Sequence, residues 1–460
     1  MKTLLKRAGY SISILLLTVN LCQPASAQTS VPSNYIEEGF KNNLVLQQKK
    51  VSLEKALNDL QTAKSLFLPS VDFLAGYQSA NGGRSIDIPV GDMLNPVYST
   101  LNQLTNSKQF PQIKNVSQQL LPNNFYDARV HTTMPLLNTD LIYNKKIQEQ
   151  QVTLQNYEVE IYQRELVRNI KIAYFAYLGA LQSIQIYEAS AQLAEEGKRV
   201  NESLLNNGKG LPAYVLRSNS EIETIQAQLT NARLQADNAK AYFNFLLNRS
   251  REESVDANFN ATDSLQAISA LLINEPEFDG REELKSLKEA VRLNETVEKM
   301  NRSYAVPKLS GFVDLGSQAE GWKLNEDSRY YFAGLQLSVP IFAGNRNNIR
   351  IRQSELDVKN AKLGLTQATE QFVITASTSK NNLVAAYKVY LSSLKQLEAA
   401  ESYQRLIEKG YKAGTNTFIE SVDARNQLTA AQLAKNLNLY KVFVAAAELE
   451  RQTASYNIHK

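Results

Sequence analysis

The chain has 460 residues, of which 50 are Lys or Arg and 46 are Asp or Glu, with one cysteine and two histidines. Lys2, Lys6 and Arg7 lie before residue 28, so the rest of the chain has 47 basic and 46 acidic residues and no basic surface for nucleic acid. A single cysteine excludes an internal disulfide framework, and two histidines cannot form a histidine metal cluster.

Residues 1–27 have the pattern of a secretory signal. The three basic residues are followed by an apolar stretch over 12–19 and by the cleavage motif Ala-Ser-Ala at 25–27. A membrane anchor is the alternative, but this stretch is too short to cross a bilayer. Cys22 could instead carry a lipid, although bulky Leu21 precedes it where a small residue is usual. We therefore expect cleavage after residue 27 and a mature chain without a thiol.

Residues 28–248 form the first of two similar halves. A helix is predicted over 33–65, because apolar residues recur there at helical spacing. Alternating apolar and polar residues then predict one strand after Pro69 and a second that ends at Pro135. The segment between them, 80–124, is rich in Gly and Pro, which predicts a long loop.

Two further helical features complete this half. A short helix is predicted inside the long loop, at about 94–104. After the second strand, a heptad pattern runs from about 143 to 206 and, after a turn, continues back to about 248. At 1.5 Å per residue the first of these helices is on the order of 100 Å long, which predicts an elongated coiled-coil hairpin.

Residues 281–454 repeat the same order of elements. A helix is predicted over 281–303, followed by strands after Pro307 and before Pro340, and then by a second heptad-patterned hairpin. Here the connection between the strands, about 317–329, is short. The repeat indicates one body made of two related units.

The remaining segments are irregular or turns. Residues 249–280 lose the heptad and are predicted to form an irregular equatorial region, and 455–460 a polar tail. The two hairpins reverse at Asn207–Leu211 and Ala413–Asn416, where glycines permit positive φ. We expect the turn residues to contact a partner protein; they are Gly208, Gly210, Leu211, Gly410, Gly414 and Thr415.

The predicted strands indicate a membrane sheet. Aromatic residues of the kind that mark the membrane interface precede the strands before Pro135 and Pro340, namely Phe125, Tyr126, Tyr330 and Tyr331, and Trp322 lies in the short connection. A soluble sandwich would alternate in the same way, but four strands are too few for a chain of this size. In lipid, four strands also leave unpaired edges, so we expect copies of the chain to share one barrel. Two chains would supply eight strands and three would supply twelve.

The sequence has no motif for catalysis or nucleotide binding. It contains no G-x-S-x-G, P-loop, G-x-G-x-x-G or H-E-x-x-H pattern, and no run of 18 apolar residues that would form a transmembrane helix. We therefore expect a non-enzymatic protein without cofactor or metal.

Three motifs are similar to those of the TolC-type outer-membrane efflux family. They are the Leu-Pro and Val-Pro pairs at 68–69 and 306–307, the junction Val-Pro-Ile-Phe-x-Gly-x-Arg at 339–346, and the Gly-Tyr-x-x-Gly-Thr turn that begins at Gly410. The resemblance covers nearly the whole mature chain. It implies a mainly α-helical homotrimer with a twelve-stranded outer-membrane barrel continued by a helical periplasmic tunnel. It also implies a periplasmic adaptor protein and an inner-membrane pump of the RND or ABC type as partners.

The resemblance also implies residues for the periplasmic aperture. Glu420 and Asp423 match acidic residues that line it, and Tyr411 matches a tyrosine that ties neighbouring helices together. Asn416 stands where the family has an arginine, and Tyr214 where it can have an acid, so the closing contacts are expected to differ. The alternative for both acids is compensation of the helix dipole at an N-terminus.

Two other functions compete with an exit duct. A secreted coiled-coil fibre or adhesin explains the heptads but leaves the aromatic-flanked strands without a role. A periplasmic adaptor normally has one helical hairpin, whereas this chain has two. The expected function is therefore a passive exit duct driven by an inner-membrane pump.

Overall fold

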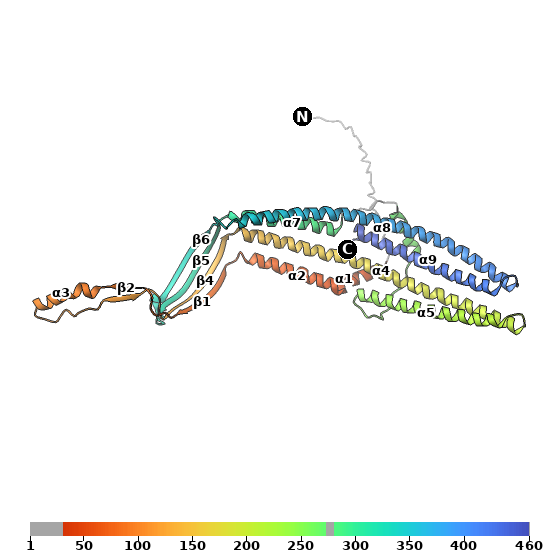
Figure 1. The fold of residues 1–460 in the computed structure, drawn as a ribbon, viewed down its shortest axis with the longest axis horizontal. Coiled ribbons are helices and arrows are strands. Elements are labelled where there is room, and N and C mark those ends of the chain that lie inside the picture. The colour runs from red at the N-terminus through yellow and green to blue at the C-terminus, as the bar shows by residue number, and fades with distance from the viewer. Residues whose placement is uncertain (1–30, 273–279, 460) are drawn as a thin grey trace, which may run out of the picture. The chain divides into compact units, whose positions relative to one another are not determined.

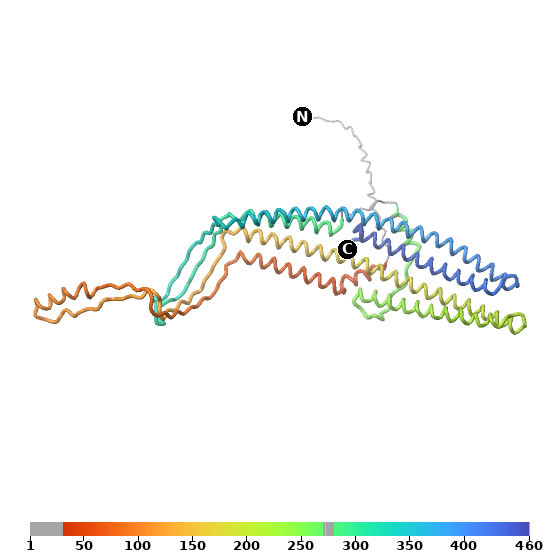
Figure 2. The backbone as a smooth tube through the Cα atoms, viewed as in Figure 1, coloured from red at the N-terminus to blue at the C-terminus, as the bar shows by residue number. Residues whose placement is uncertain are grey.

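The computed structural model describes residues 31–272 and 280–459, so the predicted signal sequence and its cysteine lie outside the described residues. The chain forms two units, each built from parts of both halves (Figures 1 and 2). We call residues 48–159 and 283–368 the sheet unit, and the described residues of 31–47, 160–282 and 369–459 the hairpin unit. Helices α4 (Thr139–Asn206) and α8 (Arg346–Lys412) contribute to both.

Four antiparallel strands in the order β1-β4-β5-β6 form the main sheet of the sheet unit. They are β1 (Ser70–Gln78), β4 (Phe125–Leu137), β5 (Lys308–Glu320) and β6 (Arg329–Ser338). Helix α2 (Leu44–Ser65) precedes β1, and α7 (Glu282–Arg302) with the 3-10 turn η1 (Ser303–Ala305) precedes β5. A second 3-10 turn, η2 (Glu326–Ser328), precedes β6. Within the described chain, β1 and β6 are each paired along one edge only.

The two faces of this sheet differ in chemistry. One face exposes apolar side chains, including Phe73 at 72%, Leu335 at 71% and Tyr331 at 80% exposure. The opposite face carries charged and polar groups: Asp127 accepts from Arg129 at 2.6 Å, and His131 hydrogen bonds Asp314 on the neighbouring strand. Alternation along the four registered strands separates the faces, as the sequence predicted, although Leu74, Phe312 and Phe332 also lie on the face of His131 and Asp314.

The strand boundaries differ from the predicted ones. The second strand was expected to end at Pro135, but β4 continues to Leu137. Pro135 lies beside a register shift against β5, where a missing N–H is tolerated. At the other end, β5 extends to Glu320, so the connection predicted over 317–329 is shorter than expected.

About half of the predicted loop 80–124 is regular structure. A two-stranded ribbon of β2 (Ser85–Ile88) and β3 (Val116–Gln119) has α3 (Val90–Leu104) at its end. The predicted short helix is thus confirmed and begins four residues earlier than 94. We call residues 79–124 the excursion; it leaves the sheet at the end opposite to α2 and α4 (Figure 1).

Helices form the hairpin unit. They are α1 (Ser33–Asn42), α5 (Pro212–Leu246), α6 (Ala261–Leu271), α9 (Phe418–Thr453) and the remaining parts of α4 and α8. The long ones pair as two antiparallel hairpins, α4 with α5 and α8 with α9 (Figure 1). The predicted heptad positions Leu166, Ile170 and Ala173 of α4, with Ile225 and Leu229 of α5, are buried. Among the described residues, no helix is both long enough and apolar enough to cross a membrane.

The helix predicted over 33–65 is interrupted at Asn43. Its amide donates to the carbonyl of Leu246 at 2.9 Å, and its side-chain oxygen accepts from the N–H of Leu46 at 3.0 Å. Asn43 therefore ends α1 and caps α2. The equatorial region predicted to be irregular over 249–280 also differs, because it contains α6, whose Ile268 is fully buried.

The predicted polar tail packs on α4. Arg164 donates to the carbonyls of Ala454 at 2.9 Å and Tyr456 at 2.6 Å, and it also pairs with Glu282. Lys171, 1% exposed, pairs with Glu450 at 2.6 Å. Burial raises the pKa of Glu450, an effect that Lys171 opposes.

Candidate functional site

The two hairpins of the hairpin unit reverse with the same backbone pattern. In the first reversal the N–H of Lys209 donates to the carbonyl of Leu204 at 2.8 Å, and in the second Thr415 donates to Gly410, also at 2.8 Å. Gly208 and Gly414 have φ values of +69° and +80°, which a side chain would strain. These are the bonds of a Schellman motif, and they confirm the predicted helix reversals.

The remaining predicted turn residues lie in or beside these reversals. Leu211 is 55% exposed and precedes Pro212, which occupies the first turn of α5. Gly210 lies against the turn backbone, where an added Cβ would be 2.7 Å from the N atom of Leu205, and Gly410 lies against the side chains of Thr415 and Asn416.

A capping box holds the start of α9. Thr417 accepts from the N–H of Glu420 at 3.3 Å, and the Glu420 carboxylate accepts from the N–H of Thr417 at 2.7 Å. Asn416 donates to the same carboxylate at 3.2 Å. These hydrogen bonds hold the pKa of the Glu420 carboxyl below its usual range, and the bond from the Thr417 backbone has the largest effect. The Asn416 side-chain amide therefore makes its hydrogen bond within its own turn.

Asp423 lies one helical turn further along the same exposed face. It accepts from Gln427 at 2.7 Å and remains exposed, as Glu420 does. The two predicted acids are thus adjacent, but one is committed to capping a helix and the other is not.

Phe418 joins the two reversals. Its side chain is 1% exposed, and its ring centroid lies 5.1 Å from that of Tyr214 and 6.0 Å from that of Tyr411. The structure thus brings together Tyr214 and Tyr411, which the sequence singled out separately. Burial raises the pKa of the Tyr411 hydroxyl, and the neighbouring Tyr214 raises it further by a smaller amount.

A hydrogen-bond chain runs across this contact. The Tyr411 hydroxyl donates to Asn201 of α4, whose amide donates to Ser218 of α5 at 2.8 Å. Asn201 and Ser218 are both buried, at 2% and 0% exposure. The second hairpin is therefore tied to both helices of the first.

A buried ion pair that the sequence analysis missed lies beside this chain. Arg425 of α9 donates to Glu221 of α5 at 3.2 and 2.8 Å, and to Ser421 at 3.0 Å. The side chains of Arg425 and Glu221 are 5% and 6% exposed. Gly197 of α4 makes room, because an added Cβ there would lie 2.9 Å from Nη1 of Arg425. A glycine inside a long helical pattern was the one local signal of this contact.

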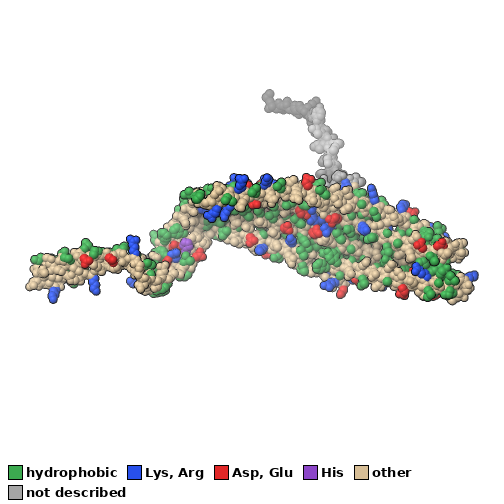
Figure 3. Space-filling view, viewed as in Figure 1, with side chains coloured by type: hydrophobic (Ala, Val, Ile, Leu, Met, Phe, Trp, Pro, Cys, Tyr) green, Lys and Arg blue, Asp and Glu red, His purple; other side chains and the backbone are tan. Residues whose placement is uncertain are grey.

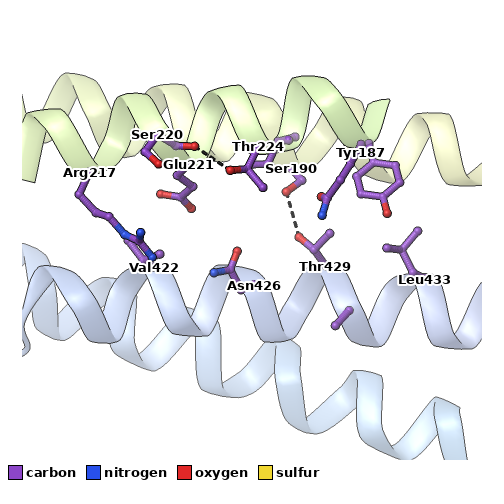
Figure 4. Close-up of a pocket in the computed structure, with 13 residues that line it drawn as sticks. Tyr187, Ser190, Arg217, Ser220, Glu221, Thr224, Val422, Asn426, Thr429 and Leu433 are labelled. Atoms are coloured by element: carbon purple, nitrogen blue, oxygen red, sulfur yellow. Dashed lines mark hydrogen bonds between the residues drawn. The ribbon is translucent and has the colours of Figure 1, made fainter. Parts of the chain in front are cut away.

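A polar cavity of about 320 Å³ adjoins the ion pair. Figure 4 shows Arg217 and Glu221 of α5 on one side and Asn426 and Thr429 of α9 on the other. Ser190 of α4 meets Thr429 at 2.9 Å and closes part of the space. The cavity therefore lies between the two hairpins and is lined by polar groups that can bind water.

The predicted interface aromatics lie at the end of the sheet from which the excursion leaves. The Trp322 ring stacks between those of Tyr77, at 5.3 Å, and Tyr126, at 5.5 Å. Tyr126 is buried, and Tyr331 is exposed on the apolar face. Phe125 and Tyr330 belong to the charged face, where Tyr330 donates to Asp127 at 2.9 Å. The predicted set is therefore divided between the two faces.

No metal site is formed by the residues that the structure describes, since none of their His, Cys, Asp and Glu side chains gather in groups of three or more. The capping box, the tyrosine contacts and the buried ion pair bind and position helices, and they contain no arrangement of a nucleophile and a base.

Known proteins share both sequence and fold with this chain. TolC of Escherichia coli is 22% identical over 409 residues, covering 85% of this chain and 75% of TolC. The alkaline protease secretion protein AprF of Pseudomonas aeruginosa is 22% identical over 338 residues, covering 70% of this chain and 69% of AprF. The CmeC outer membrane channel of Campylobacter jejuni superposes with a TM-score of 0.71 at 13% identity, covering 99% of this chain and 94% of CmeC.

A family model agrees with these comparisons. The outer membrane efflux protein model matches residues 36–249 and 281–455, which are the two predicted halves with little omitted. The chain therefore belongs to the outer membrane efflux protein family.

Proposed function

We propose that this chain forms, as a homotrimer, the outer-membrane exit duct of a tripartite efflux or export system. The observation that carries this proposal is the sheet, which has one apolar exposed face, one charged face and two edges paired on one side only. Three copies would close a twelve-stranded barrel whose apolar face meets lipid and whose charged face lines the channel. The hairpins would continue this barrel as a tunnel into the periplasm.

This arrangement accounts for features that a secreted fibre does not. A coiled-coil fibre has no use for a sheet that exposes Phe73 and Leu335 to water, since exposed apolar patches of this kind mark membrane or protein contacts. An adaptor or a pump must supply specificity and energy, because the sequence has no nucleotide-binding motif. The name of AprF describes secretion of a protease, which favours export as one use of such a duct.

The reversals are proposed to form the closed periplasmic end and to contact the adaptor. Three copies of Glu420 and Asp423 would place six carboxylates around one opening, where they would favour cations. Asn416, which stands where the family has an arginine, donates its hydrogen bond to Glu420 in the same turn. We therefore propose that Tyr411, Phe418 and the Arg425–Glu221 pair hold the periplasmic end of the hairpins together instead.

Conductance in planar bilayers tests the duct directly. We expect the purified chain to require detergent, to form particles with three-fold symmetry and to conduct ions. A soluble monomeric rod without conductance would refute the proposal.

The aperture assignment needs a narrower test. The double variant Glu420→Gln/Asp423→Asn removes both charges but keeps oxygen acceptors for the capping bonds. We expect weaker block by divalent cations or higher conductance, whereas Glu223→Gln on the exposed face of α5 should change neither. Unchanged block and conductance in the double variant would refute the aperture role while leaving the duct intact.

A further inference from the structure

The excursion has an unusual distribution of polar and apolar groups. Gly91 is its only buried residue, so its apolar side chains form no core of their own. Met93, Val97 and Leu104 of α3 are 69%, 52% and 78% exposed, and Ile86 on the ribbon is 50% exposed. Figure 3 shows hydrophobic side chains along this segment with few charged ones between them.

Hydrogen bonds fix the polar face of α3 inward. Asn95 donates to the carbonyl of Ile113 and accepts from its N–H, both at 2.9 Å. Asn102, seven residues later, makes the same pair of bonds to Phe110 at 2.8 and 3.1 Å. Gly91 allows α3 to lie this close to the returning segment, because an added Cβ would lie 2.9 Å from the side-chain oxygen of Asn115. The amphipathic helix is thus held with its apolar face outward.

That apolar face has heptad spacing. Its residues are Val90, Leu94, Val97, Leu101 and Leu104, with steps that alternate four and three. This is the spacing of a coiled-coil seam, with Leu94 and Leu101 at the a positions and Val90, Val97 and Leu104 at the d positions. Leucine at a with mainly β-branched residues at d favours trimers or larger bundles over dimers.

Charge argues against lipid as the occupant of this face. Helices that lie on membranes carry Lys and Arg on their polar face, where they meet headgroups. The only charged residue of α3 is Asp92, which accepts from Asn115 at 2.9 Å, while Asn95 and Asn102 are bonded to the returning segment. The basic residues nearest to α3, Lys108 and Lys114, lie on the returning segment, and the seam itself is neutral, which fits another neutral seam.

The excursion leaves the sheet beside the surface through which copies are proposed to associate. The excursion begins directly after Gln78, the last residue of β1, whose outer edge is unpaired in the described chain. A neighbouring copy paired with that edge would bring its own excursion close to this one.

We propose that the α3 helices of three copies pack through this seam into a parallel coiled coil that caps the outer mouth of the barrel. The inference rests on the proposed trimer. Its partner is a second and a third copy of this chain, and the contact is made by Leu94, Val97, Leu101 and Leu104.

Cross-linking of the full chain tests the cap. Val97→Cys and Leu104→Cys place thiols in the seam, and Gln103→Cys places one on the exposed opposite side as a matched control. In detergent-purified trimers, a short bis-maleimide should link two of the three chains in each seam variant. The control and the wild-type chain should remain monomeric on a denaturing gel.

Three other outcomes would overturn the cap. If trimers form by native mass measurement but neither seam variant cross-links, the seam does not join copies. If a lipid-phase maleimide labels Cys at position 97 in phospholipid vesicles as fast as it labels a lipid-facing position of the sheet, the face lies in the membrane. If the wild-type chain forms no trimer, the proposed function fails as well, and the mass measurement distinguishes that case.

Discussion

Removal of Glu221 should weaken the junction between the two hairpins. Arg425 would then remain buried, at 5% side-chain exposure, with only Ser421 as an acceptor. Breaking a buried ion pair by removing one partner costs about 3–5 kcal/mol. The polar cavity beside Glu221 would admit water, so we expect the lower end of this range for Glu221→Ala.

Amide hydrogen exchange measures this loss where it occurs. A cost of about 3 kcal/mol raises the local opening equilibrium roughly 100-fold, because each 1.4 kcal/mol is a factor of ten. We expect this increase over residues 197–205 of α4 and 418–425 of α9. Residues 166–175, in the well-packed part of α4, should exchange as in the wild-type chain.

Two variants make the prediction refutable. Glu221→Leu/Arg425→Met removes both charges and should exchange within about tenfold of wild type, since replacing a buried pair by apolar groups is often nearly neutral. Glu223→Gln, two residues away and exposed, should have no effect. If Glu221→Ala left exchange unchanged, or if the double variant were as unstable as the single one, the ion pair would not join the hairpins.

Three further predictions concern single residues. Asn43→Ala should lower the free energy of unfolding in urea by about 1–2 kcal/mol, because it removes the cap of α2 and the bond to Leu246. Gly414→Ala should cost about 1 kcal/mol in the same assay, since its φ of +80° strains any side chain. The lowered pKa of Glu420 means that its capping contribution is complete above the ordinary carboxyl pKa and is lost as the pH falls through the lowered value. Exchange at the first turn of α9 should therefore rise in acid, and Glu420→Gln should abolish that pH dependence.

Local signals in the sequence were sufficient for most of the helices and strands. Heptad spacing predicted α4 and its return, and the glycines at 208 and 414 predicted both reversals, because each depends on neighbouring residues only. Alternation predicted the two faces of the sheet for the same reason, since a strand has a period of two.

Contacts between distant residues were not predictable in this way. Asn43 breaks a continuous helical pattern because it bonds Leu246, 203 residues later. Arg425 and Glu221 are 204 residues apart, and neither lies in a motif. The Asn95 and Asn102 bonds of the excursion use ordinary polar residues in a segment where the sequence indicated a loop with a short helix but not how that helix packs.

The two units differ in how complete their apolar packing is within one chain. In the hairpin unit, Leu166, Ile170, Tyr174 and Phe243 are fully buried, so its helices have a core of their own. The buried hydrophobic residues of the sheet unit are Ala56, Ala63, Tyr126, Val159, Leu284, Val291 and Val358, most of them small and on helices rather than strands. The sheet and α3 instead expose their apolar faces, and hydrophobic burial is the main favourable contribution to folding. The hairpin unit can therefore be stable in a single chain, whereas in the proposed trimer lipid and other copies would cover the exposed apolar surface of the sheet unit.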